Sequence, residues 1–188
     1  MKKNVKIYQT LTDRDNPDYI QDNGPFKCKH KKAWLGSGYY FWDTFIENAH
    51  WWGSDSLKSP YIICEAKISI DYNSCFDLVG NTNHMLEFEK AFEFLKKQNL
   101  ADSTTNVSRV INYLRSINTF SYDCVRVNGI NSKSKHIQPN YQLKFEMNKL
   151  PHFEYKPPIQ FCIFNLQKLD FREYRIIYPD YYFEDYVI

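Results

Sequence analysis

The chain has little glycine, no long hydrophobic run and no surplus of charge of either sign. It contains 6 glycines in 188 residues, against about 13 in an average chain of that length. No apolar stretch reaches the roughly 18 residues that indicate a membrane-spanning helix. The opening MKKNVKIYQT lacks the apolar core of a signal peptide. We therefore expect a cytoplasmic protein that does not enter a membrane.

Charge and cysteine content exclude further classes of protein. The 24 Lys and Arg residues nearly balance 22 Asp and Glu residues, for a net charge of +2, whereas a dedicated nucleic-acid binder is usually strongly basic. The five cysteines include no C-x-x-C pair, which favours a reducing compartment without disulfides. Cys28 and His30 lack a second ligand pair at zinc-finger spacing, so we expect no metal site.

Aromatic residues are what the chain has in abundance. Its 15 Tyr, 14 Phe and 4 Trp make up 18% of the sequence. A chain of this length buries roughly two-thirds of its unfolded surface, so it needs no disulfide or metal to be stable. We expect one domain, residues 1–188, with a core packed largely from rings.

The hydrophobic pattern predicts strands at both ends of the chain with helices between them. Apolar residues at helical spacing predict helices over about 84–98 and 105–118, and Thr44 with Glu47 has the pattern of a capping box. Alternating or β-branched runs predict strands at residues 4–11, 34–43, 60–70, 121–127, 159–164 and 174–178. This order indicates an α+β fold rather than a regular βαβ repeat.

Two of the scarce glycines, Gly36 and Gly38, interrupt an aromatic strand candidate that continues through Tyr39 and Tyr40. Glycine weakens the interior of a strand. Its presence therefore indicates either a bulge in a core strand or a place where a ligand or another backbone approaches closely.

The segment LGSGYYFWD (35–43), followed by Ala49 and Trp52, resembles the middle motif of ADP-ribosyltransferases of the poly-ADP-ribose-polymerase and diphtheria-toxin type. In that family a Gly-x-Gly strand continues into aromatic residues and leads to a helix. The resemblance implies that Tyr40 stacks on the nicotinamide ring of NAD, with Gly38 and Tyr39 also at the NAD site.

Two other segments resemble the first and third motifs of the family. In residues 7–10, Tyr8 and then Gln9 and Thr10 stand where the family has Tyr-His-Gly, which implies that all three contact NAD and that Gln9 holds the adenosine ribose. Residues 159–164 resemble the late strand that begins with a glutamate. Gln160 stands at that position and would contact the nicotinamide ribose, with Glu154 as an alternative carboxylate.

The resemblance implies two small, roughly perpendicular β-sheets around a cleft, with flanking helices. It implies an enzyme with NAD as its substrate, with Gln9, Tyr40 and Gln160 as catalytic residues and Arg14 reaching the pyrophosphate. ADP-ribose would pass to a protein or nucleic-acid acceptor, or NAD would be hydrolysed. Small stand-alone bacterial members of the family often look like toxins or phage-defence effectors, so the resemblance implies such a role for this chain. The alternative is an inactive module of this fold that binds a nucleotide, a protein or a nucleic acid.

Two polar segments leave their roles open. The basic run 27–32 either contacts phosphates of a nucleotide or nucleic acid or is a solvated loop. Residues 131–158 have no clear period, so they form either a loop that recognises the acceptor or a connection.

Overall fold

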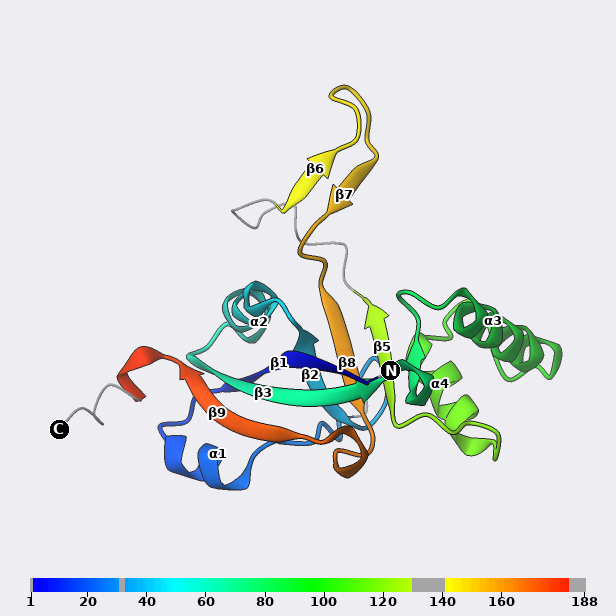
Figure 1. Ribbon diagram of the computed structural model, residues 1–188. Coiled ribbons are helices and arrows are strands. Elements are labelled where there is room, and N and C mark those ends of the chain that lie inside the picture. The colour runs from blue at the N-terminus through cyan, green and yellow to red at the C-terminus, as the bar shows by residue number, and fades with distance from the viewer. Residues whose placement is uncertain (1, 31–32, 130–140, 183–188) are drawn as a thin grey trace.

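The computed structural model describes residues 2–30, 33–129 and 141–182 (Figure 1). Its main element is a seven-stranded sheet in the order β4-β5-β8-β2-β1-β3-β9. β4 and β5 run parallel, and the other neighbouring strands run antiparallel. The strands are β1 (Lys2–Thr12), β2 (Tyr39–Asp43), β3 (Tyr61–Asp71), β4 (Cys75–Asp77), β5 (Cys124–Asn128), β8 (Ile159–Ile163) and β9 (Arg172–Tyr178).

The expected pair of small perpendicular sheets is corrected to one large sheet and a separate hairpin. β1 and β2 join the two halves of the large sheet through the pairs Ile7↔Asp43 and Tyr8↔Trp42, whereas β1 and β3 pair along their full lengths. Because those two pairs continue the ladder, both halves belong to one sheet. The hairpin consists of β6 (Gln142–Lys144) and β7 (His152–Glu154). The coarser expectation of a mixed fold, with helices placed between strands in the sequence, is confirmed.

Two short helices, α1 (Pro17–Asn23) and α2 (Ile46–Trp51), cover opposite faces of β1, β3 and β9 (Figure 1). Successive residues of a strand point to opposite faces, and β3 shows the consequence. Ile63 packs with Ala49 of α2, whereas its neighbours Ile62 and Cys64 pack with Ile20 of α1. The continuous apolar run of β3 is therefore buried on both sides.

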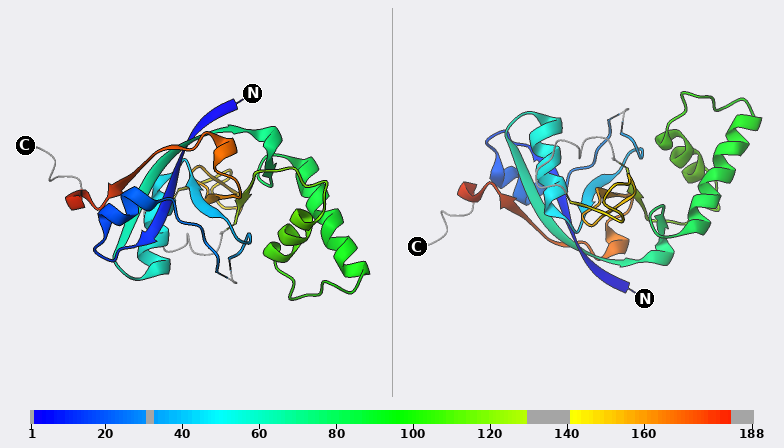
Figure 2. Two further views of the ribbon diagram at one scale, coloured as in Figure 1. Left: turned by 90° about the horizontal axis from the view of Figure 1, so that it is seen from below. Right: turned by 90° about the horizontal axis from the view of Figure 1, so that it is seen from above.

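The two longer helices, α3 (Thr82–Lys97) and α4 (Val107–Ser116), lie together at the end of the sheet formed by β4 and β5 (Figure 2). Both confirm the helices expected over about 84–98 and 105–118. Their N-termini are capped by the side chains of Asn81 and Asn106. The buried stripe of α4 packs against Phe76 and Val125 and consists of Val110, Ile111 and Leu114.

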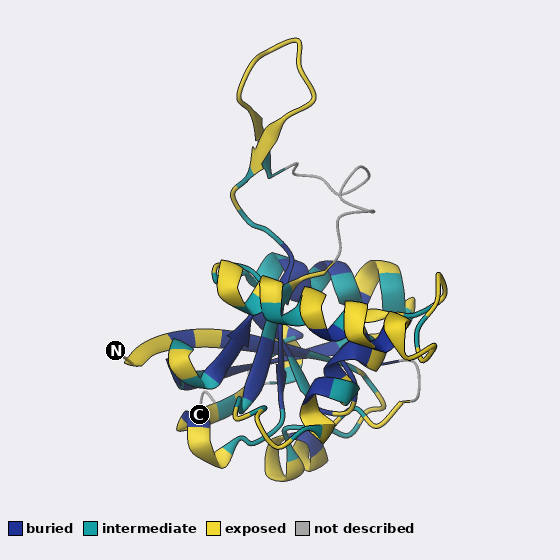
Figure 3. Cartoon of the chain, turned by 90° about the vertical axis from the view of Figure 1, so that its right-hand side faces the viewer, coloured by how far each residue is buried: buried dark blue, intermediate teal, exposed yellow. Residues whose placement is uncertain are grey.

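The hairpin of β6 and β7 stands away from the rest of the molecule, and we call residues 141–156 the arm (Figure 3). It carries a set of exposed apolar side chains: Leu143, Phe145, Met147, Leu150 and Phe153. The arm leads directly into β8, and it provides the structure of the part of residues 131–158 that is described.

Two local expectations are wrong. Residues 34–38 form a loop rather than the start of a strand, since Gly36 has a φ of 87° and β2 begins at Tyr39. Thr44 does not cap α2 because it has a left-handed backbone (φ 63°) and donates its hydroxyl hydrogen to Asp43. Phe45 is the N-cap of α2, without a side-chain bond. The short strand β4 was not expected.

The described residues contain no helix with the length and apolar character to cross a membrane. Their His, Cys, Asp and Glu side chains form no group of three or more that is suited to a metal ion. The five cysteines are all free thiols, and four of them are buried.

Candidate functional site

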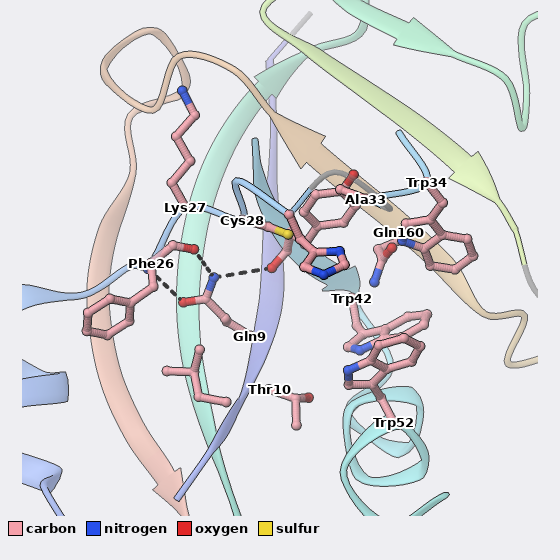
Figure 4. A pocket seen from close by; sticks show the side chains of 13 residues that line it. Gln9, Thr10, Phe26, Lys27, Cys28, Ala33, Trp34, Trp42, Trp52 and Gln160 are labelled. Carbon is pink, nitrogen blue, oxygen red and sulfur yellow. Dashed lines mark hydrogen bonds between the residues drawn. The ribbon is translucent and has the colours of Figure 1, made fainter. Parts of the chain in front are cut away.

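A cavity of about 470 Å³ lies against the three central strands, β1, β2 and β8 (Figure 4). The remaining wall consists of Trp52, which begins a π-helical turn, Trp52–Leu57, and of Phe26, Lys27, Cys28, His30, Ala33 and Trp34. A cavity of this size is in the usual range for small-molecule sites, roughly 300–1,000 Å³. The strands contribute Gln9, Thr10, Leu11, Tyr40, Trp42 and Gln160. The structure thus brings Gln9, Tyr40 and Gln160 to one cavity.

Strand register explains why Thr10, Trp42 and Gln160, far apart in the sequence, meet here. Tyr40 and Trp42 are two residues apart on β2 and therefore share a face. Trp42 pairs with Gln160 on β8 and with Tyr8 on β1, and directly opposed residues also share a face. Thr10, two residues beyond Tyr8, completes this wall.

Gln160 is 5% exposed, and its Oε1 has no hydrogen-bond partner in the described structure. An unpaired buried polar group costs about 1–3 kcal/mol, so such atoms are few in native proteins. Gln160 lies in the cavity wall (Figure 4), where a donor from a bound molecule would satisfy it. This side chain is the strongest candidate for contact with a ligand.

Gln9 also lines the cavity, but its amide is already bonded within the chain. Its Nε2 donates to the Phe26 carbonyl at 2.9 Å, and its Oε1 accepts from the Phe26 N–H at 3.1 Å and from the Tyr174 hydroxyl at 2.9 Å. A longer contact of 3.5 Å joins Nε2 to the Tyr40 carbonyl. These bonds hold the loop at Phe26 against β1, so Gln9 positions the cavity wall.

The Tyr40 hydroxyl is fixed by two bonds to the preceding loop. It donates to the Gly36 carbonyl at 2.7 Å and accepts from the Leu35 N–H at 2.9 Å. Burial, reinforced by the nearby Cys162, raises the pKa of this phenol far above its ordinary value. Tyr40 therefore stays neutral and offers the cavity an oriented aromatic ring rather than an acid or a base.

Of the other strand residues that the resemblance assigns to NAD, Thr10 lines the cavity, whereas Tyr8 and Tyr39 do not. Thr10 lines the cavity and donates its hydroxyl hydrogen to the Ala49 carbonyl at 3.0 Å. Tyr8 is buried in the cluster under α2, and Tyr39 packs against the core on the other face of β2. Neither of these tyrosines lines the cavity.

Close packing within the chain accounts for both glycines of the middle motif. Gly36 has a positive φ, and a Cβ there would lie 2.7 Å from the Asn112 Oδ1. A Cβ on Gly38 would lie 2.4 Å from the Cys162 Sγ and 3.0 Å from the Ile163 carbonyl oxygen. Neighbouring protein atoms, not the cavity, therefore require glycine at these two positions.

Arg14 lies outside the cavity, on an adjoining hollow of about 390 Å³. The hollow shares Thr10, Leu11 and Phe26 with the cavity. Asn16 lines it as well, and its Oδ1 is buried without a hydrogen-bond partner. An elongated ligand could therefore extend from Gln160, past Thr10, to Arg14.

All four tryptophans gather around the cavity, a feature that the sequence analysis did not identify. Trp34, Trp42 and Trp52 line it, and Trp51 packs beneath. The ring centroids of Trp34 and Trp52 are 6.3 Å apart, and the centroids of Trp42 and Trp52 are 6.1 Å apart. The one signal in the sequence is that Trp34 and the pair 51–52 flank the glycine-aromatic motif.

The described residues of the cavity wall include one lysine and one histidine. Lys27 and His30 line it, and none of the described residues on its walls is a carboxylate. Glu154 pairs with Gln142 in the arm and is not part of the cavity wall. Burial raises the pKa of the Glu154 carboxyl, with a smaller opposing effect of His152.

No family model, curated protein or solved structure matches this chain. The resemblance to ADP-ribosyltransferases therefore rests on the sequence motifs, and the geometry of the cavity indicates a binding site.

Proposed function

We propose that the cavity binds NAD and that the protein is an ADP-ribosyltransferase. The observation that carries this proposal is that Tyr40 and Gln160, from two separate motifs, line one cavity in which the Gln160 Oε1 lacks a partner. The nicotinamide ring stacks on Tyr40, and the Gln160 Oε1 accepts a hydrogen bond from a hydroxyl of the adjoining ribose.

The adjoining hollow supports an extended dinucleotide. Arg14 supplies a positive charge and Asn16 an unpaired acceptor beyond Thr10. Guanidinium groups bind phosphate by strong, charge-assisted hydrogen bonds. The pyrophosphate therefore lies toward Arg14. Gln9 would contact the adenosine ribose only by giving up a bond to Phe26 or Tyr174, so we assign it the positioning of the loop.

The reaction breaks the bond between the ribose C1′ and the nicotinamide nitrogen, and nicotinamide leaves as a neutral molecule. The acceptor, or water, then bonds to C1′ and loses its proton to solvent. As this bond breaks, positive charge develops on the ribose, and preorganised negative charge would stabilise it. Gln160 supplies a dipole there without a full charge. We therefore expect slow turnover in the natural protein and faster turnover in Gln160→Glu.

The test is incubation of the purified protein with adenylate-labelled NAD, with and without cell lysate. Released nicotinamide and labelled macromolecules are measured for the natural protein and for Tyr40→Ala, Gln160→Ala and Gln160→Glu. Gln98→Ala, an exposed glutamine at the end of α3, is the matched control and should behave as the natural protein does. Failure of the natural protein both to bind NAD and to release nicotinamide would refute the proposal.

A second candidate function is an inactive module of the same fold that binds a nucleotide, a protein or a nucleic acid. It is favoured by the lack of a carboxylate among the described cavity residues and by the internal bonding of Gln9. Calorimetry with NAD separates the two functions. Heat of binding without nicotinamide release, and no gain of activity in Gln160→Glu, would favour the module.

A further inference from the structure

The proposed NAD site leaves the tryptophans of the cavity without a role. Trp34 and Trp52 are half-buried on its wall, with ring planes 14° from parallel and centroids 6.3 Å apart. Rings in contact have centroids about 4.5–7 Å apart, so this pair is at the loose end of the range. Two indoles of nearly common orientation provide flat surfaces for a further planar ring.

Basic residues line the same cavity as these indoles. Lys27 and His30 line the same cavity, and Lys29 is exposed on the loop between them. Lysine side chains on such a rim can neutralise the phosphates of a nucleic-acid backbone. Lys27 and His30 thus line the same cavity as the two indoles, and basic side chains together with aromatic surfaces are the combination by which proteins hold single strands.

We propose that Trp34 and Trp52 stack an unpaired base of a single-stranded nucleic acid and that this base is the acceptor of ADP-ribose. The acceptor role rests on the proposed function, whereas the stacking site does not. A base must leave its helical stack before its ring can enter a pocket. The site therefore favours single strands over duplexes. The backbone then runs along Lys27 and Lys29, and the base is held in the cavity that contains Gln160.

In the transfer step a nitrogen of the stacked base forms a bond to the ribose C1′ of NAD. The bond from C1′ to nicotinamide breaks with its electron pair, so that nicotinamide leaves neutral. The proton of the attacking nitrogen passes to solvent. No oxidant, reductant or metal is needed for this balance.

Intrinsic fluorescence tests the stacking site directly because the four tryptophans of the chain all belong to this cluster. The full chain is titrated, without NAD, with a mixed-sequence DNA or RNA strand of about 12 nucleotides, a length within known single-strand site sizes. The same strand as a duplex is the comparison. We expect the single strand to quench the fluorescence and to bind more weakly as salt rises from about 50 mM to about 200 mM.

Variants assign the binding to particular residues. Loss of one base–aromatic stack costs about 1–3 kcal/mol, so Trp34→Ala should weaken binding about 5-fold to 150-fold. Trp51→Phe is the matched control, since Trp51 is buried outside the cavity wall and its Nε1 has no partner to lose. Lys27→Gln, an exposed change that leaves the indoles intact, should lower the salt slope by about one if it contacts a phosphate.

The possible outcomes separate this inference from the proposed function. Absence of single-strand binding by the natural protein, equal binding of the duplex, or undiminished binding by Trp34→Ala overturns the stacking site. With labelled NAD added, label on the oligonucleotide supports the acceptor role, and label on protein alone overturns it. If the strand binds while NAD is neither bound nor consumed, the stacking site is supported and the acceptor role fails with the proposed function.

Discussion

The Tyr174 hydroxyl donates a 2.9 Å hydrogen bond to the Gln9 Oε1 and so links β9 to β1 across the intervening strand β3. The same Gln9 amide makes both of its other short bonds to the backbone of Phe26. One side chain therefore connects the edge of the sheet, its centre and the loop that forms a cavity wall.

The first prediction concerns this amide. Gln9→Ala leaves the half-buried partners of three bonds unpaired, and an unpaired group costs up to about 1–3 kcal/mol when it is fully buried. Tyr174→Phe removes one bond while Gln9 keeps its bonds to Phe26, so it should cost about 1 kcal/mol. Urea denaturation of both variants measures the difference. Equal losses in the two variants would show that Gln9 does not hold the loop at Phe26.

The second prediction concerns the contact between Gly38 and Cys162. A Cβ on Gly38 would lie 2.4 Å from the Cys162 Sγ, and overpacking in a core typically costs about 1–3 kcal/mol. We expect Gly38→Ala to be destabilised by about that amount. In Gly38→Ala/Cys162→Ala the loss should be smaller than the sum of the single losses, because the sulfur atom is gone. Additive losses in this double-mutant cycle would exclude the proposed clash.

The third prediction uses the one cysteine that is not buried. Cys28 lines the cavity, and the other four cysteines are buried. Burial raises the pKa of both Cys64 and Cys162 to about 12, so their thiolates are scarce at neutral pH. Mass spectrometry after brief iodoacetamide treatment should show one modification, at Cys28.

NAD provides the control for this labelling. If NAD occupies the cavity, saturating NAD should slow the modification of Cys28, whereas free ribose at the same concentration should not. Chain unfolded in guanidinium should react at all five cysteines. An unchanged rate at Cys28 with NAD present would argue against NAD in this cavity.

The elements that could be predicted from the sequence are those whose pattern repeats over many residues. The stripe of α4, with Val110, Ile111 and Leu114, and the β-branched run of β3 determine these elements locally. The sequence does not predict the conformation of Thr44, whose hydroxyl donates a hydrogen bond to Asp43, because Asp43 is itself held by Arg126 at 2.8 Å. That second contact is made by a residue far along the chain.

The candidate site was predictable only in part for the same physical reason. The motifs identified Tyr40 and Gln160 separately, but their meeting depends on the register Tyr40↔Cys162 and Trp42↔Gln160 between distant strands. The contact between Trp34 and Trp52 joins two segments that lie on either side of β2 in the sequence. Local periodicity contains no information about either contact.

The fourth prediction concerns the pH dependence of stability at His50. Burial lowers the pKa of this imidazole below its ordinary value of 6.5, and Glu47 opposes the effect. The unfolded chain therefore binds the proton more readily than the folded protein does. By linkage, the stabilising effect of a neutral His50 is present above pH 6.5 and is lost as pH falls below that value.

The measurement is the free energy of unfolding at several pH values above and below 6.5. His50→Gln should flatten the decline just below pH 6.5 because it removes the titrating group. Loss of the contacts that His50 makes to Tyr61 and Tyr178 should lower stability at every pH. The slope, rather than the overall loss, is thus the diagnostic quantity, and an unchanged slope would contradict the assignment.

The fifth prediction compares how much one leucine in the arm and one leucine in the core contribute to the free energy of unfolding. Leu150 in the arm is 92% exposed, whereas Leu114 on α4 is 2% exposed. Leu150→Ala removes almost no buried surface, so the free energy of unfolding should change by less than about 0.5 kcal/mol. Leu114→Ala leaves a cavity in the cluster with Phe76 and Val125 and should cost about 2–5 kcal/mol. Urea denaturation of the two variants provides the comparison. A loss above about 1 kcal/mol in Leu150→Ala, well outside the usual range for surface changes, would mean that the arm packs on the chain in solution.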